Sequence, residues 1–152
     1  MVKIYKKILF ATDGSPHSDN AAKQIVDFQK EWNCKVVFFH SLKHNKYPSI
    51  FHSDNYILSV DNRNNVELRK ELGKEILIQT KKIFDKAHIS VEPRLIEDED
   101  PEDYIKRSVK EEEFDLVVLG SNGHHSKSQK SFLGTRPTKI LKHTPCDVLI
   151  IR

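Results

Sequence analysis

Long hydrophobic runs are missing from this sequence, and so is a secretion leader. No stretch approaches the roughly 18 consecutive apolar residues that a transmembrane helix needs, so we expect no membrane span. Residues 1–7 include three lysines but lack an apolar core followed by a small-residue cleavage site. We therefore expect neither a membrane protein nor a secreted one.

Cysteine is scarce as well. The two cysteines, Cys34 and Cys146, form no C-x-x-C pair, no zinc-site spacing and no disulfide framework. This usage is typical of a reducing compartment, so we expect a cytoplasmic protein.

Several nucleotide-binding and hydrolase motifs are absent. The chain contains no G-x-x-x-x-G-K-[ST], no G-x-G-x-x-G after the first predicted strand, no G-x-S-x-G and no H-E-x-x-H. These absences argue against a P-loop NTPase, a dinucleotide enzyme, an α/β-hydrolase and a zincin. The charge is also nearly balanced, at 25 basic against 22 acidic side chains, and does not indicate nucleic acid as a partner.

What is present suits one globular domain over residues 1–152. Its length is close to that of a single domain, and 38% apolar with 31% charged residues is enough to build a real core. Apolar runs rich in β-branched and aromatic residues predict strands at residues 7–11, 35–39, 90–96, 115–119 and 147–151.

Helical spacing of apolar residues separates these runs. It predicts helices from Pro16 to about Trp32 with Ser15 as the N-cap, over residues 64–87 with a tolerated Gly73, from Pro101, and after Thr135. Residues 41–62 have no sustained period and predict a long loop. Strictly alternating strands and helices predict an α/β fold with a mostly parallel sheet, and Pro93 places its strand at the sheet edge.

Ligands of such sheets bind beyond the carboxyl ends of the strands, where the strand order reverses. Two turns have a suitable composition, residues 12–15 after the first strand and 120–123 after the fourth. Residues 116–146 contain no Asp or Glu but carry five lysines and arginines and three histidines. This basic stretch favours an anionic ligand at the second turn, the alternative being a solvated basic helix with a loop.

Single residues in these turns allow more than one interpretation. Asp13 at a strand end suits either a nucleoside or divalent-cation contact, or a cap on the turn before the first helix. His124 and His125 are expected to be surface histidines because adjacent residues rarely converge on one metal. His40 ends a buried strand and is expected to be a satisfied core histidine.

Three segments of the chain together resemble the universal stress protein family. They are residues 6–15, with the sequence KKILFATDGS, residues 115–123, with DLVVLGSNG, and residues 142–152, with KHTPCDVLIIR. Family members that bind ATP carry the motif G-x2-G-x9-G-[ST], which Gly120, Gly123, Gly134 and Thr135 resemble.

The resemblance implies a five-stranded sheet of order 3-2-1-4-5 with helices on both faces, the fold of the adenine nucleotide alpha-hydrolases. It also implies ATP, with magnesium, bound between strands one and four of a homodimer that pairs through its last strand. Asp13 would contact the adenosine end, the backbone near Ser41 would edge the adenine, and the glycine motif would hold ribose and phosphates. The predicted nucleotide contacts are Thr12, Asp13, Ser41, Leu119, Gly120, Ser121, Gly123, Gly134, Thr135 and Arg136.

Two differences from the family pattern keep other functions open. Ten residues separate Gly123 from Gly134 where the motif has nine, and Pro137 removes one backbone donor that would face a phosphate. The first hypothesis is an ATP-binding sensor or regulator with little or no hydrolysis and an unidentified protein partner. The alternatives are an interaction module that has lost nucleotide, or a small enzyme, such as a slow ATPase, in the same crevice.

Overall fold

The computed structural model describes residues 3–43, 62–121 and 135–152. Strands and helices alternate along them as β1 (Lys7–Ala11), α1 (Pro16–Trp32), β2 (Lys35–Ser41), α3 (Asn62–Lys86), β3 (Glu92–Ile96), α4 (Pro101–Glu112), β4 (Leu116–Gly120), α5 (Thr135–His143) and β5 (Asp147–Ile151). Each predicted strand and helix is present, with bounds within two residues of the expected ones. None of the helices in these ranges is long and apolar enough to span a membrane.

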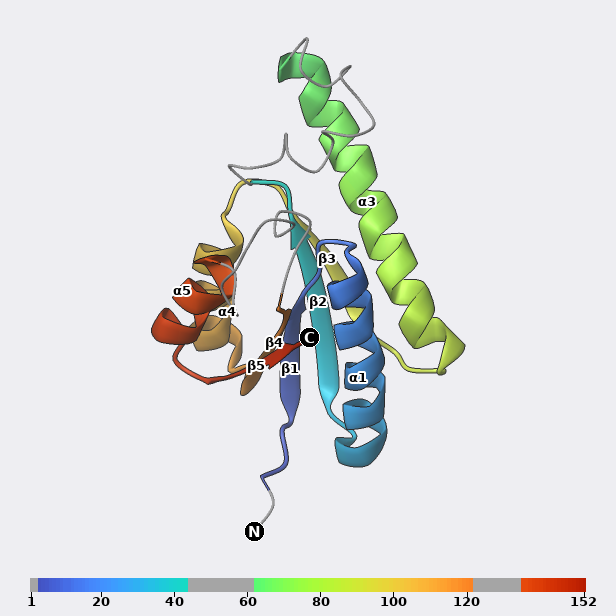
Figure 1. Ribbon diagram of the computed structural model, residues 1–152, viewed down its shortest axis with the longest axis vertical. Coiled ribbons are helices and arrows are strands. Elements are labelled where there is room, and N and C mark those ends of the chain that lie inside the picture. The colour runs from blue at the N-terminus through green and yellow to red at the C-terminus, as the bar shows by residue number, and fades with distance from the viewer. Residues whose placement is uncertain (1–2, 44–61, 122–134) are drawn as a thin grey trace.

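The five strands form one parallel sheet in the order β3-β2-β1-β4-β5. This confirms the predicted fold class and strand order, including the edge position of β3. Helices α1 and α3 cover one face of the sheet, and α4 and α5 cover the other (Figure 1). The central strand β1 has β2 on one side and β4 on the other, so the strand order reverses between β1 and β4.

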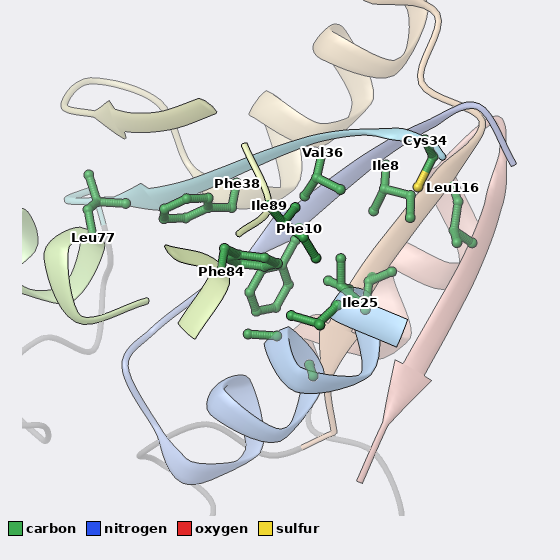
Figure 2. Packing of buried hydrophobic residues seen from close by; sticks show 14 residues of the cluster. Ile8, Phe10, Ile25, Cys34, Val36, Phe38, Leu77, Phe84, Ile89 and Leu116 are labelled. Carbon is green, nitrogen blue, oxygen red and sulfur yellow. The ribbon is translucent and has the colours of Figure 1, made fainter. Parts of the chain in front are cut away.

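Alternate residues of the central strands supply two separate hydrophobic cores. On β1, Ile8 and Phe10 face α1 and α3, whereas Leu9 faces α4 and α5. Figure 2 shows the first core, in which the rings of Phe38 on β2 and Phe84 on α3 have centroids 5.9 Å apart. Because the central strands are buried on both faces, their sequences are continuous apolar runs rather than alternating ones.

Helix α1 begins as its sequence predicts. Ser15 is the N-cap, its side chain accepts a hydrogen bond from Ser18 N at 3.2 Å, and Pro16 occupies the first turn. The helix ends at Asn33, a residue in the left-handed region with φ 51°, whose backbone N–H donates to Gln29 O. These caps fix where the chain enters and leaves α1, and so fix the turn that follows β1.

Gly73 is tolerated within α3, as the sequence predicts, and the structure adds a packing reason for it. A side-chain carbon there would lie 2.7 Å from Leu42 Cδ2 and 3.0 Å from Leu95 Cδ1. The glycine therefore lets α3 lie directly against the ends of β2 and β3. Both cysteines, Cys34 and Cys146, are free thiols, as expected.

Candidate functional site

The predicted ligand residues that the structure describes gather at the carboxyl edge of the sheet. Phe10 of β1 pairs in register with Val118 of β4, so Thr12 and Gly120 each come two residues beyond this pair on neighbouring strands. Ser41 ends β2 on the other side of β1. The reversal point of the strand order thus brings the turn after β1 close to the end of β4, as the topology rule for parallel sheets requires.

The turn after β1 is organised around the carboxylate of Asp13. Its Oδ1 accepts hydrogen bonds from Ser15 N at 2.9 Å and from Ser18 Oγ at 2.7 Å. Gly14 between them has φ +76°, which glycine adopts without strain. The capping role considered for Asp13 is therefore present, and it orients this carboxylate at the start of α1.

Thr12 is buried and held by two other elements of the fold. Its hydroxyl oxygen lies 3.2 Å from Thr80 Oγ1 of α3 and accepts a hydrogen bond from Gly14 N at 3.3 Å. Its carbonyl oxygen is 2.8 Å from Nδ1 of His40 on β2. The predicted contact residue Thr12 is thus 5% exposed, and its side chain is part of the framework beneath the turn.

His40 is the satisfied core histidine that the sequence predicted. Burial lowers the pKa of its imidazole below the ordinary 6.5, while the bond to the Thr12 carbonyl and the charge of Asp13 act in the opposite direction. The net lowering keeps this histidine neutral at pH 7.

Gly120 ends β4 in contact with the first turn of α1. A side-chain carbon on Gly120 would lie 3.1 Å from the carbonyl carbon of His17 and 3.2 Å from Ser18 N. The sequence predicts close approach of a ligand to this glycine, and the structure adds a packing reason for it. Leu119, one residue earlier, is buried in the second core with 5% exposure.

Ser121 continues from β4 with its backbone N–H donating to Ile151 O at 2.8 Å. Its side chain is 1% exposed, and within the described residues no hydrogen-bond partner lies near its hydroxyl oxygen. The same holds for Nδ1 of His17 in the first turn of α1, a residue that the sequence analysis did not single out. Buried polar atoms normally have a partner, and among the described residues Ser108 Oγ on α4 and Thr144 Oγ1 after α5 also lack one, so the feature is not confined to residues 17 and 121.

Ser41 lies at the opposite side of the site and is held by the chain that follows β3. Its hydroxyl donates to Glu99 O at 2.6 Å and accepts from Lys43 N at 3.2 Å. The side chain is therefore occupied within the fold, which leaves the backbone as the part considered for adenine.

The remaining predicted contacts belong to the connection between β4 and α5. Gly123 and Gly134 fall outside the described residues, as do the side chains of Thr135 and Arg136 and both His124 and His125. Thr135 begins α5, and because α5 joins two parallel strands its N-terminus lies toward the carboxyl edge of the sheet. A helix N-terminus in that place favours an anion.

Sequence reasoning missed Ser18, Thr80 and His17 as members of this site. Ser18 had a local signal, since it lies three residues after the N-cap Ser15 and so faces back toward it. Thr80 had none, because it meets Thr12 only through the packing of α3 on the sheet. Within the described residues, no group of three or more His, Cys, Asp or Glu side chains is arranged to hold a metal ion.

Comparison with known proteins places this architecture in a family. The family model described as the universal stress protein family matches residues 4–152. The chain belongs to the universal stress protein family. The resemblance inferred from the sequence is thereby confirmed.

Two curated members of the family span nearly the whole chain. A universal stress protein of Methanocaldococcus jannaschii is 26% identical over 149 residues, covering 98% of this chain and 83% of the relative. A putative universal stress protein of Staphylococcus haemolyticus is 28% identical over 150 residues, covering 97% of this chain and 85% of the relative.

Solved structures of family members share the fold. The universal stress protein UspA from Lactobacillus plantarum superimposes with a TM-score of 0.77 at 18% identity, covering 99% of this chain and all of that one. An Archaeoglobus fulgidus member in complex with dAMP gives 0.66 at 18% identity, covering 99% and 100%. An Arabidopsis thaliana member with AMP bound gives 0.66 at 20% identity, covering 96% and 90%. At these identities the likeness establishes the fold.

Proposed function

We propose that this stress protein binds an adenine nucleotide at the carboxyl ends of β1 and β4, and that ATP is its ligand. The observation that carries the proposal is the reversal point itself, where the Asp13 turn and the end of β4 lie on neighbouring strands. The buried hydroxyl of Ser121, without a partner among the described residues, fits a site for a polar ligand. Family structures in complex with cAMP, dAMP and AMP support the choice of an adenine nucleotide.

The proposed ligand contacts follow the order of the strands. The backbone near Ser41 would edge the adenine and Asp13 would contact the adenosine end. Gly120 and Ser121 would lie against ribose and phosphates, with Gly123 as the next contact along the chain. Leu119 and Thr12 would support these contacts from within the sheet.

Gly134, Thr135 and Arg136 would hold the phosphates at the start of α5, where the helix dipole and a guanidinium favour negative charge. Magnesium bound with ATP would neutralise part of the phosphate charge.

The proposed role is that of a sensor or regulator rather than an efficient enzyme. Fast hydrolysis needs a base positioned to activate water. The one carboxylate at the turn, Asp13, has Oδ1 held by Ser15 N and Ser18 Oγ, which suits orientation of a bound group better than proton transfer. We place the protein in the cytoplasm, in keeping with its two free thiols.

The two edges of the sheet differ in a way that supports a homodimer through β5. Edge strand β3 carries Pro93, and its Arg94 forms a two-pronged ion pair with Glu112 of α4, with N–O distances of 2.7 and 2.8 Å. Edge strand β5 carries only apolar side chains after Asp147, and all of them are partly exposed. Because an open apolar edge favours pairing with another strand, a second copy of β5 is the proposed partner.

The nucleotide proposal is tested first by asking what the purified protein carries. Protein prepared without added nucleotide is denatured in acid, and the released small molecules are identified by mass spectrometry. Calorimetry with AMP, and with ATP in the presence and absence of magnesium, then measures affinity. We expect bound ATP or ADP, or micromolar binding of ATP with magnesium.

A pair of matched variants locates the ligand. Asp13→Asn removes one negative charge while keeping the Oδ1 acceptor for Ser15 and Ser18. Asp19→Asn removes the same charge in the first turn of α1 and serves as the control. Altered affinity in Asp13→Asn alone supports the site. Protein that releases no nucleotide and gives no heat with either ligand would instead support the interaction module without nucleotide.

A further inference from the structure

We propose that His40 is a positioning residue for the nucleotide, because its imidazole fixes the peptide group between Thr12 and Asp13. This inference rests on the proposed nucleotide site at the end of β1. It assigns a role to a buried side chain that does not itself reach the ligand.

The direction of the hydrogen bond identifies the tautomer of His40. Its Nδ1 lies 2.8 Å from the carbonyl oxygen of Thr12, and a carbonyl oxygen only accepts. Nδ1 must therefore carry the proton. This contact between β2 and the turn after β1 thus requires a proton on Nδ1, and burial, which lowers the pKa of the imidazole, favours the neutral form of the ring.

The peptide group that His40 holds is hydrogen-bonded through both its oxygen and its nitrogen. Its oxygen, on Thr12, faces His40 Nδ1, and its nitrogen, on Asp13, donates to Ser18 Oγ at 3.3 Å. Ser18 Oγ in turn donates to the Asp13 carboxylate at 2.7 Å. A chain of hydrogen bonds that begins at His40 therefore reaches the Asp13 side chain, the proposed adenosine contact, whose Oδ1 also accepts directly from Ser15 N at 2.9 Å.

Helix α3 holds the imidazole in place. A side-chain carbon on Gly73 would lie 3.3 Å from His40 Cδ2, so the backbone of α3 lies against the carbon edge of the ring. Thr80, further along the same helix, meets the Thr12 hydroxyl at 3.2 Å. His40 is 4% exposed and so has little freedom to turn away from Thr12. The packing thereby selects one ring orientation.

Three variants separate positioning from general stability. His40→Phe keeps a buried planar ring but has no donor. His40→Asn places an amide N–H close to where Nδ1 stands. Phe38→Leu changes the neighbouring side chain on the same face of β2, which packs against Phe84 and lies in the first core. This variant should lower stability but removes no hydrogen bond to Thr12, and so serves as the control. AMP affinity is measured by calorimetry for each variant beside its thermal unfolding.

We expect His40→Phe to weaken AMP binding by about three- to tenfold, the worth of one hydrogen bond. His40→Asn should return to within about twofold of wild type, and Phe38→Leu should bind like wild type at a temperature where it is folded. Nitrogen-15 NMR of the wild-type protein should show His40 protonated at Nδ1.

Other results overturn the inference. The positioning role would be removed if His40→Phe bound AMP with wild-type affinity, or if Phe38→Leu lost as much AMP affinity as His40→Phe. It would also be removed if NMR showed the imidazole protonated only at Nε2. A wild-type protein that binds no adenine nucleotide would instead overturn the proposed function, a result distinct from nucleotide binding that ignores His40.

Discussion

Gly120 of β4 and His17 of α1 meet backbone to backbone, so closely that a side-chain carbon on Gly120 would lie 3.1 Å from the carbonyl carbon of His17. The glycine that begins the proposed nucleotide motif is therefore also the residue on which the first turn of α1 rests. Two requirements, one of packing and one proposed for binding, fall on a single position.

This contact predicts the effect of Gly120→Ala. The added methyl group meets main-chain atoms of α1, which move less readily than a side chain would. We expect the free energy of unfolding to fall by about 1–3 kcal/mol, measured by urea denaturation. Unchanged stability would show that α1 shifts freely at its N-terminus.

Ser121→Ala, one residue further on, is the matched comparison for Gly120→Ala. It should change the free energy of unfolding in the opposite direction. Its buried hydroxyl has no partner in the described part of the chain, so its removal relieves a desolvation cost. We expect the free energy of unfolding of nucleotide-free protein to rise by about 1 kcal/mol. The same variant should lose nucleotide affinity. A loss of stability in the free protein would indicate that the hydroxyl is already paired.

The ion pair of Arg94 with Glu112 predicts a pH-dependent stability. The hydrogen bonds from Arg94 hold the pKa of Glu112 below its usual 4.5. A carboxyl group with a lowered pKa stabilises the fold fully above its unfolded pKa and loses that contribution as pH falls through the folded value. Arg94→Met should therefore cost about 1 kcal/mol at pH 7, and the difference from wild type should shrink below pH 4.5.

Arg107→Met provides the control for that measurement. Arg107 lies on α4, the helix that carries Glu112, and pairs with Glu99 and Glu111, each at 2.8 Å, but in an exposed position. Solvent screens such pairs, so little change in stability is expected. If Arg94→Met and Arg107→Met lowered the free energy of unfolding equally, the partial burial of Arg94 would add nothing to the strength of its ion pair.

Leu149→Lys tests the proposed dimer. Leu149 lies in the middle of β5, and two lysines brought together across a paired edge would repel. We expect a monomer by light scattering. Ile78→Lys, at a residue of α3 that is 49% exposed, should leave the dimer intact. A dimer that survives Leu149→Lys with its fold unchanged places the interface elsewhere.

The sequence predicted the sheet well because its signals are local. Continuous apolar runs between turn residues define strands that are buried on both faces, and Pro93 identified one sheet edge. It also predicted the cap at Ser15 and the core role of His40. The packing reason for Gly73 could not be predicted, because it is the approach of Leu42, just after β2, and Leu95 of β3.

The residues of the candidate site could be proposed from the sequence, but the hydrogen bonds that organise them could not. The topology rule led to the ends of the first and fourth strands, where the structure has Asp13 and Gly120. The bond between Thr12 and Thr80 joins residues 68 positions apart, and no local pattern encodes it. Asp13 is the contrary case, since its partners Ser15 and Ser18 lie within five residues of it and its capping role could be considered from the sequence.

The order β3-β2-β1-β4-β5 has a consequence for the growing chain during synthesis. Everything needed for the β3-β2-β1 half of the sheet has been made by residue 96, whereas β4 begins at residue 116. Until then, one side of β1 has no neighbouring strand. A ligand that needs both β1 and β4 can only be captured after Gly120 has been made, so nucleotide retention would distinguish chains that include β4 from shorter ones.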